Sequence, residues 1–202
     1  MSKFDLFAEA NSQSGVVEKV REVFGKYGEF HVDNADVINQ VSKLENVTPA
    51  LIAVTWLNET TFRFYSEPNK NNSTDFMRWD VGPMQLNRRV TTQDINVGFI
   101  SPKGLDISAA FGSGVDLFVG SPIMNIRLSA RKLKALGRAV LIGKDGVVLF
   151  PKVSLVEWSN LTEADKDLRR AVAYTGPDAR NYRQKSFETF YPLFTKFFSI
   201  YK

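Results

Sequence analysis

The segment from Thr48 to Glu59 most constrains the fold of this chain, because it predicts a helix that has to be buried. Thr48 followed by Pro49 is a typical helix start, with a capping residue and a proline at the first helical position. Apolar side chains then surround nearly the whole helix axis: Leu51, Ile52, Val54, Trp56 and Leu57. A helix without a polar face needs other elements packed around it, so we expect it at the centre of the domain.

Further helices and one short β element are predicted around this segment. Helical spacing of apolar residues, or a helix start signal, marks five other segments: 14–27, 36–44 with Asn34 or Asp36 as its cap, 122–136 after Ser121, 162–173, and the aromatic-rich 187–198. Residues 139–150 hold two short apolar runs around a Lys-Asp-Gly turn, which is typical of a hairpin, although a buried helical turn is the alternative. We expect a mainly α fold with a small β-hairpin element near residues 139–150.

Composition excludes several kinds of chemistry. The chain has 202 residues, no cysteine and a single histidine, His31. Cysteine nucleophiles, thiolate zinc sites and disulfides are therefore excluded, and neither a Ser-His-Asp triad nor a multi-histidine metal site is expected. We expect no metal and no cofactor, so the chemistry has to come from carboxylates, hydroxyls, amides and aromatic rings.

The formal net charge of +4 suits an acidic polymer as partner. The basic residues are scattered along helices without a nucleic-acid-binding signature, so we do not expect nucleic acid to be that polymer. No apolar run is long enough for a transmembrane segment, and Asp5 and Glu9 interrupt the one that a leader peptide would need. We expect a monomer, with residues 1–35 as an N-terminal helical extension and residues 36–202 as the main domain.

Glu59 is the first candidate for chemistry. A carboxyl at the end of a buried helix is a candidate for a raised pKa, because desolvation disfavours its charged form and keeps a proton available for donation. The alternative is a surface Glu at a fraying helix end.

Four separated stretches resemble the soluble lytic transglycosylase and goose-type lysozyme superfamily. Residues 36–59 resemble its opening two helices, the second of which ends on the catalytic Glu, and Glu59 takes that place. Gly82-Pro83-Met84-Gln85 is similar to the family's Gly-Leu-Met-Gln motif. Residues 122–133, which include Asn125-Ile126, resemble a later helix, and residues 173–177 resemble a shortened Ala-Tyr-Asn-Ala-Gly-Pro.

The resemblance covers roughly residues 36–195 and has three departures. The interval between Glu59 and Gly82 is longer than usual, so a loop over residues 61–80 has grown. Thr175 stands where the family has Asn, and one residue is missing before Gly176. The segment between residues 138 and 151 has no counterpart in the family.

The resemblance implies a lysozyme-like fold that binds peptidoglycan glycan strands and cleaves their β-1,4 bond between N-acetylmuramic acid and N-acetylglucosamine. In the lytic transglycosylase route, Glu59 protonates the bridging oxygen and then removes a proton from the substrate's own 6-hydroxyl. The product is a 1,6-anhydro sugar, and no second carboxylate is needed. Gly82, Met84 and Gln85 are implied to line the cleft, and Tyr174 is implied to hydrogen-bond Glu59 or the substrate.

Two alternatives stay open. A goose-type hydrolase would need a second carboxylate as base, for which Asp75 and Asp80 are candidates, although a loop Asp is often a turn former. The neutral Asn87, where goose-type enzymes carry Asp, argues against this route. An inactive glycan-binding or structural module is the other alternative, motivated by Thr175. For action at the cell wall without a visible leader, we expect a phage-type lysin, a virion component, a non-standard export route or a removed leader.

Overall fold

The computed structural model describes residues 32–64, 68–111, 121–142, 146–175 and 180–201. Its α-helices are α3 (Val32–Glu45), α4 (Pro49–Thr60), α5 (Arg88–Asn96), α6 (Ile107–Phe111), α7 (Pro122–Ala135), α8 (Leu155–Asn160), α9 (Glu163–Thr175) and α10 (Arg180–Ile200). A short 3-10 helix, η1, spans Phe76–Arg78. Two antiparallel pairs of strands complete the fold: β1 (Asp80–Val81) with β2 (Leu86–Asn87), and β3 (Leu141–Ile142) with β4 (Val148–Phe150). The predicted mainly helical class with a small β part is confirmed.

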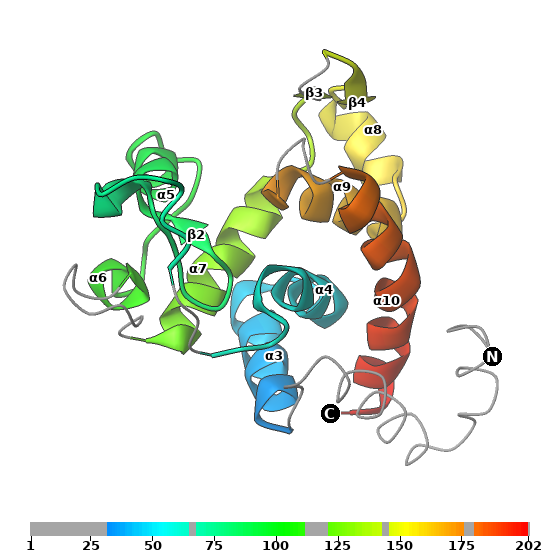
Figure 1. The fold of residues 1–202 in the computed structure, drawn as a ribbon. Coiled ribbons are helices and arrows are strands. Elements are labelled where there is room, and N and C mark those ends of the chain that lie inside the picture. Colours follow the sequence, from blue (N-terminus) through cyan, green and yellow to red (C-terminus); the bar gives the residue numbers. More distant parts are fainter. Residues whose placement is uncertain (1–31, 65–67, 112–120, 143–145, 176–179, 202) are drawn as a thin grey trace.

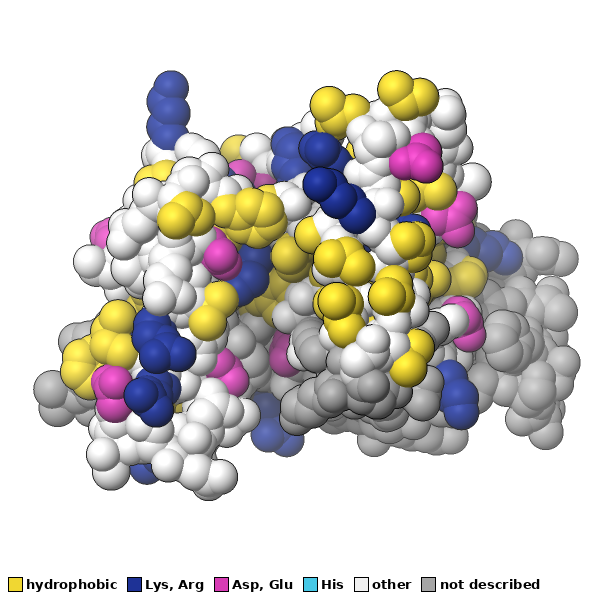
Figure 2. Space-filling view, turned by 90° about the horizontal axis from the view of Figure 1, so that it is seen from above, with side chains coloured by type: hydrophobic (Ala, Val, Ile, Leu, Met, Phe, Trp, Pro, Cys, Tyr) yellow, Lys and Arg dark blue, Asp and Glu magenta, His cyan; other side chains and the backbone are white. Residues whose placement is uncertain are grey.

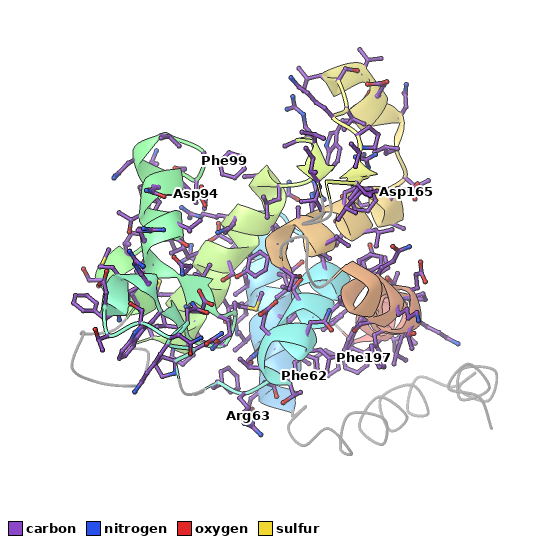
Figure 3. The ribbon with its side chains drawn as sticks, turned by 45° about the horizontal axis from the view of Figure 1, so that its top comes forward. Phe62, Arg63, Asp94, Phe99, Asp165 and Phe197 are labelled. Atoms are coloured by element: carbon purple, nitrogen blue, oxygen red, sulfur yellow. The ribbon has the colours of Figure 1, made fainter. Side chains whose placement is uncertain are left out.

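Helix α4 lies at the centre of the helical body, as its composition predicts. It begins at Pro49 with Thr48 in the N-cap position, and all side chains from residue 50 to residue 57 are buried. Helices α3, α9 and α10 contact it on different sides (Figure 1). Phe62, which is labelled in Figure 3, makes an edge-on ring contact with Trp56 of α4 and another with Phe194 of α10. The centroid distances are 5.7 and 5.8 Å.

The described residues form two hydrophobic cores rather than one. The larger core surrounds α4 and takes in side chains from α3, α7, α9 and α10. The smaller one joins β1, β2 and α6, with Val81, Leu86 and Phe111 among its buried members. Helix α7 contributes to both, because Ile126 belongs to the larger core and Leu128 to the smaller. Helix α7 therefore connects the two hydrophobic cores.

Most of the predicted helix starts and the hairpin are found. Helix α7 begins after Ser121, whose hydroxyl accepts a hydrogen bond from the backbone N–H of Met124 at 3.3 Å. The β3–β4 hairpin falls within the predicted segment 139–150. The helix predicted over residues 14–27 and His31 lie outside the described residues. Among the helices that the structure describes, none has the length and apolarity that are needed to cross a bilayer.

The predicted start of α3 is wrong. Asn34 and Asp36 lie inside this helix rather than at its cap, because Asn34 is buried and donates through Nδ2 to the carbonyl oxygen of Phe62 at 3.0 Å. Tertiary contacts thus extend the helix beyond its local signal. The expected domain boundary between residues 35 and 36 falls within α3, and Ala35 is fully buried in the larger core. Residues 32–35 therefore belong to the helical body.

A buried carboxylate fixes the beginning of α4. Thr48 does not cap the helix with its side chain; its hydroxyl donates instead to Oδ2 of Asp167 on α9. Asp167 also accepts from the hydroxyl of Tyr191 on α10 at 2.8 Å and from Arg170 at 2.7 Å. Burial raises the pKa of Asp167, and these hydrogen bonds offset part of that effect. Helices α4, α9 and α10 are joined by this one side chain.

Candidate active site

A pocket of about 410 Å³ lies beside the C-terminal end of α4. Its walls come from the end of α4, the β1–β2 hairpin, the start of α5 and the ends of α7 and α9. Glu59, Asp80, Gln85 and Tyr174 line it, together with Asn69, Leu86, Asn87, Val90, Lys132 and Thr175. The face seen in Figure 2 is hollowed between its two halves, and acidic and basic side chains lie close together there.

This pocket lies at the junction of the two hydrophobic cores. Glu59 follows the buried part of α4 in the larger core, whereas Asp80 and Leu86 belong to the hairpin over the smaller core. Tyr174 packs against both cores. Pockets at junctions between packed units are common binding sites, because such junctions are concave and polar groups from both sides reach them.

Glu59 is the second-to-last residue of α4 and is half-buried, with its Oε1 oxygen buried. The chain turns sharply after it: Thr61 and Phe62 adopt left-handed backbone conformations, with φ of 52° and 69°. Such values are unfavourable for a β-branched residue such as Thr and persist only where the surroundings enforce them. Phe62 provides that enforcement, because its side chain is only 2% exposed. The end of the helix, and Glu59 with it, is thereby held in one place.

The turn over residues 82–85 lies next to the end of α4 and contributes Gln85 to the pocket wall. Gly82 has a φ of 77°, and its carbonyl oxygen accepts from the backbone N–H of Gln85 at 3.0 Å and from the side-chain amide of Gln85 at 3.1 Å. The hydroxyl of Thr60, the neighbour of Glu59, donates to the carbonyl oxygen of Pro83 at 2.7 Å. This bond ties the end of α4 directly to the turn.

Asn125 of α7 holds the turn from the other side. Its side chain is fully buried and makes hydrogen bonds with three backbone groups. Oδ1 accepts from the N–H of Met84, and Nδ2 donates to the carbonyl oxygens of Val81 and Ala110, all at 3.1 Å. A buried amide with these bonds satisfied is a rigid connector, because losing any one of them leaves a buried polar group without its partner.

Tyr174 of α9 contacts the same turn. Its hydroxyl donates to the carbonyl oxygen of Met84 at 2.8 Å and lies 3.1 Å from Oγ of Ser129. Burial raises the pKa of Tyr174 well above its ordinary value, and the nearby charges of Glu59 and Asp80 raise it further. The hydroxyl therefore stays protonated and acts as a donor. The hydroxyl bonds the backbone of the turn rather than Glu59, so Tyr174 positions the site, and a bond to the substrate stays a prediction.

Asp80 places a second carboxylate in the pocket. Its Oδ1 accepts from Nδ2 of Asn87, and its Oδ2 accepts from Nδ2 of Asn71, both at 2.9 Å. The backbones of Asp80 and Asn69 exchange two further hydrogen bonds, at 2.9 and 3.0 Å. A carboxylate offers about four lone-pair positions, so two amide donors leave capacity for a water molecule or a sugar hydroxyl.

Three of the expected site residues have other roles. Met84 is fully buried in the larger core, so its side chain cannot line the cleft; its backbone N–H and carbonyl are what the site uses. Gly82 is also buried and does not line the pocket, and a Cβ added to it would meet the side chain of Asn125. Asp75 is exposed and lies outside the pocket wall, because its carboxylate caps η1 by accepting from Met77 N at 3.0 Å.

Some pocket residues carry no clear signal in the sequence. Asn69 belongs to a polar loop that gives no sign of its pairing with β1. Lys132 was only one of many scattered basic residues. A signal for it does exist, because it follows Asn125 by seven residues and Ser129 by three, which places all three on one face of a helix.

The pocket offers acid–base chemistry and recognition of hydroxyl groups. Its carboxylates, Glu59 and Asp80, can give or take protons, and the amides of Asn69, Gln85 and Asn87 can bind hydroxyl and acetamido groups. Among the described residues, no group of three or more histidine or acidic side chains could hold a metal ion. A comparison with known protein families, curated proteins and solved structures finds no match to this chain.

Proposed function

We propose that this protein cleaves the β-1,4 bond between N-acetylmuramic acid and N-acetylglucosamine in peptidoglycan, with Glu59 as the general acid. One observation supports the proposal above all others. Glu59, Gln85 and Tyr174, which belong to separate stretches of the family resemblance, lie around a single polar pocket. A polar pocket of about 410 Å³ lined by amides and carboxylates suits a sugar ligand.

In this mechanism Glu59 donates a proton to the bridging oxygen while positive charge develops at the anomeric carbon. The Oε1 oxygen of this carboxyl is buried, and Glu59 lies at the end of α4, next to the turn at Thr61. In the transglycosylase route, Glu59 then takes the proton of the substrate's 6-hydroxyl, which attacks the anomeric carbon. One carboxylate performs both steps, and the product ends in a 1,6-anhydro sugar.

Hydrolysis is the second candidate, and a specific observation favours it. Asp80 lies in the same pocket as Glu59, so a second carboxylate is available as a candidate for the base that a hydrolase needs. Asp80 retains capacity to hold a water molecule beside its two amide donors. Asp75 is no longer a candidate for this role, because it caps η1 outside the pocket.

The test combines one substitution with analysis of the products. Glu59→Gln should lower the rate of cleavage of purified peptidoglycan at least about a hundredfold, because an amide of equal size cannot donate the proton. Glu188→Gln, which changes an exposed carboxylate on α10, is the matched control and should keep full activity. Circular dichroism checks that both variants are folded. Near-normal turnover by folded Glu59→Gln would exclude Glu59 as the acid.

Mass spectrometry of the released muropeptides separates the two routes. Anhydro products, each one water lighter than the hydrolysis products, together with modest loss in Asp80→Asn, establish the transglycosylase. Reducing-end products together with loss of activity in Asp80→Asn establish the hydrolase. Glycan binding without release of either product would instead identify an inactive module.

A further inference from the structure

Lys132 brings a positive charge to a pocket whose other charged groups are acidic. Its side chain is only 13% exposed and points from α7 into the same pocket as Glu59 and Asp80. Among the described residues that line this pocket, Lys132 is the only cation. The proposed cleavage uses the carboxylates and leaves this cation without a role.

The surroundings of Lys132 hold its ammonium in place without using up its donors. Nζ lies 3.3 Å from Oδ2 of Asp94 on α5, a residue that does not line the pocket (Figure 3). Nζ also lies 6.0 Å from the centroid of the Tyr174 ring, within the range of a cation–π contact. An ammonium has three N–H donors, and one ion pair engages only part of them.

The charges of the pocket make this cation useful for one kind of ligand. A ligand with an anionic group is repelled by a carboxylate such as Asp80, and by Glu59 whenever that side chain is ionised. Near the end of α7, an anionic group of the ligand would contact the positive charge of Lys132 instead. A neutral glycan gains nothing comparable from a cation at this position.

From this arrangement we infer that Lys132 forms a subsite for a carboxylate of the glycan, so that the pocket selects anionic glycan strands over neutral ones. The inference rests on the proposed peptidoglycan cleavage and adds that the site recognises a carboxylate of the substrate. In peptidoglycan the carboxylate has two sources. It is the lactyl group of muramic acid where the stem peptide has been removed, and an acidic residue of the stem peptide where it is present.

The experiment compares three substrates of similar length: intact peptidoglycan strands, strands stripped of peptide by an amidase, and neutral chito-oligosaccharide. We expect Lys132→Met to lower kcat/KM on the anionic glycans about tenfold or more, the size of a charge-assisted hydrogen bond, and to leave the neutral substrate unchanged. A loss on stripped strands identifies the lactyl carboxylate, and a loss on intact strands alone identifies the stem peptide. Lys132→Arg keeps the charge and should restore most of the selectivity.

Two control variants separate binding from a structural role. Lys134→Met removes an exposed lysine from the same helix and should change nothing on any substrate. Asp94→Asn breaks the ion pair but keeps the cation, so it should retain the preference for anionic glycans. The inference is overturned if Lys132→Met lowers all three rates equally, or if Asp94→Asn causes the same loss.

Binding measurements make the result independent of catalysis. Calorimetric titration of the same three glycans into Glu59→Gln, with and without Lys132→Met, reports the selectivity without cleavage. A protein that cleaves none of the glycans but binds the anionic ones through Lys132 would refute the proposed function and support the subsite. Binding without any dependence on Lys132, or no binding at all, would refute the subsite.

Discussion

Replacing Gly82 by alanine should destabilise the protein far more than the same replacement at Gly98. Both glycines have left-handed backbones, with φ of 77° and 74°, so both alanine variants share a conformational cost of roughly 1–2 kcal/mol. Their surroundings differ. A Cβ at Gly98 meets nothing within 4 Å, whereas a Cβ at Gly82 would lie 2.5 Å from both Cγ and Nδ2 of Asn125. The pair of variants therefore isolates the effect of this close contact.

The size of the effect follows from what Asn125 would lose. To make room for the new methyl group, its amide has to leave its hydrogen bonds with Met84, Val81 and Ala110. Each of these three bonds contributes about 1 kcal/mol net, so Gly82→Ala should cost about 3 kcal/mol more than Gly98→Ala. With the conformational cost included, the total for Gly82→Ala is about 4–5 kcal/mol.

Urea unfolding followed by circular dichroism measures both variants, with the free energy of unfolding taken from the midpoint at equal slope. Cleavage of peptidoglycan should be lost in Gly82→Ala even at temperatures where the variant is folded, because the turn that carries Gln85 into the pocket has moved. Gly98→Ala should keep its activity. A difference in unfolding free energy below about 1 kcal/mol would refute the reasoning, since it would mean that the amide moves aside without losing its bonds.

Two further predictions concern stability. Tyr174→Phe removes the hydroxyl that donates to the Met84 carbonyl and should lower the free energy of unfolding by about 1–1.5 kcal/mol. Tyr201→Phe is the control; it removes an exposed bond to Asp36 and should lower the free energy of unfolding by less than about 0.5 kcal/mol. Equal losses of the two variants in urea unfolding would contradict the positioning role of Tyr174. Because burial raises the pKa of Asp167, the folded state binds its proton more tightly than the unfolded state, and its contribution is complete below the ordinary carboxyl pKa of about 3.9. The stability of the wild type relative to Asp167→Asn should therefore fall as pH rises from about 4, and a difference independent of pH would contradict this.

The parts of the fold that the sequence predicts correctly are those with a strong local signal. Helix α4 combines a Thr-Pro start with an apolar surface on all sides, and α7 starts at a Ser-Pro pair, so the local sequence is enough to locate both helices. The start of α3 is different. Its first turn is fixed by the bond from Asn34 to Phe62, residues that are 28 positions apart, and no local pattern reports such a contact.

The same distinction applies to the site. A motif identifies positions but does not say whether the side chain or the backbone is used, which is why Met84 was expected in the cleft and is found in the core. Asp75 and Asp80 look alike in a turn-rich loop. Only their hydrogen bonds distinguish them. The backbone of Asp80 pairs with that of Asn69, and Asp80 lines the pocket, whereas Asp75 caps η1.

The turn over residues 82–85 determines how the two sides of the pocket face each other. Glu59 belongs with one hydrophobic core and Asp80 with the other, so their relative position depends on what joins the cores. Three side chains from three helices converge on the backbone of this turn: Thr60 on Pro83, Asn125 on Met84, and Tyr174 on Met84. We therefore expect Gly82, Pro83 and Met84 to act through the path of their backbone, so that a substitution there displaces one carboxylate relative to the other without touching either.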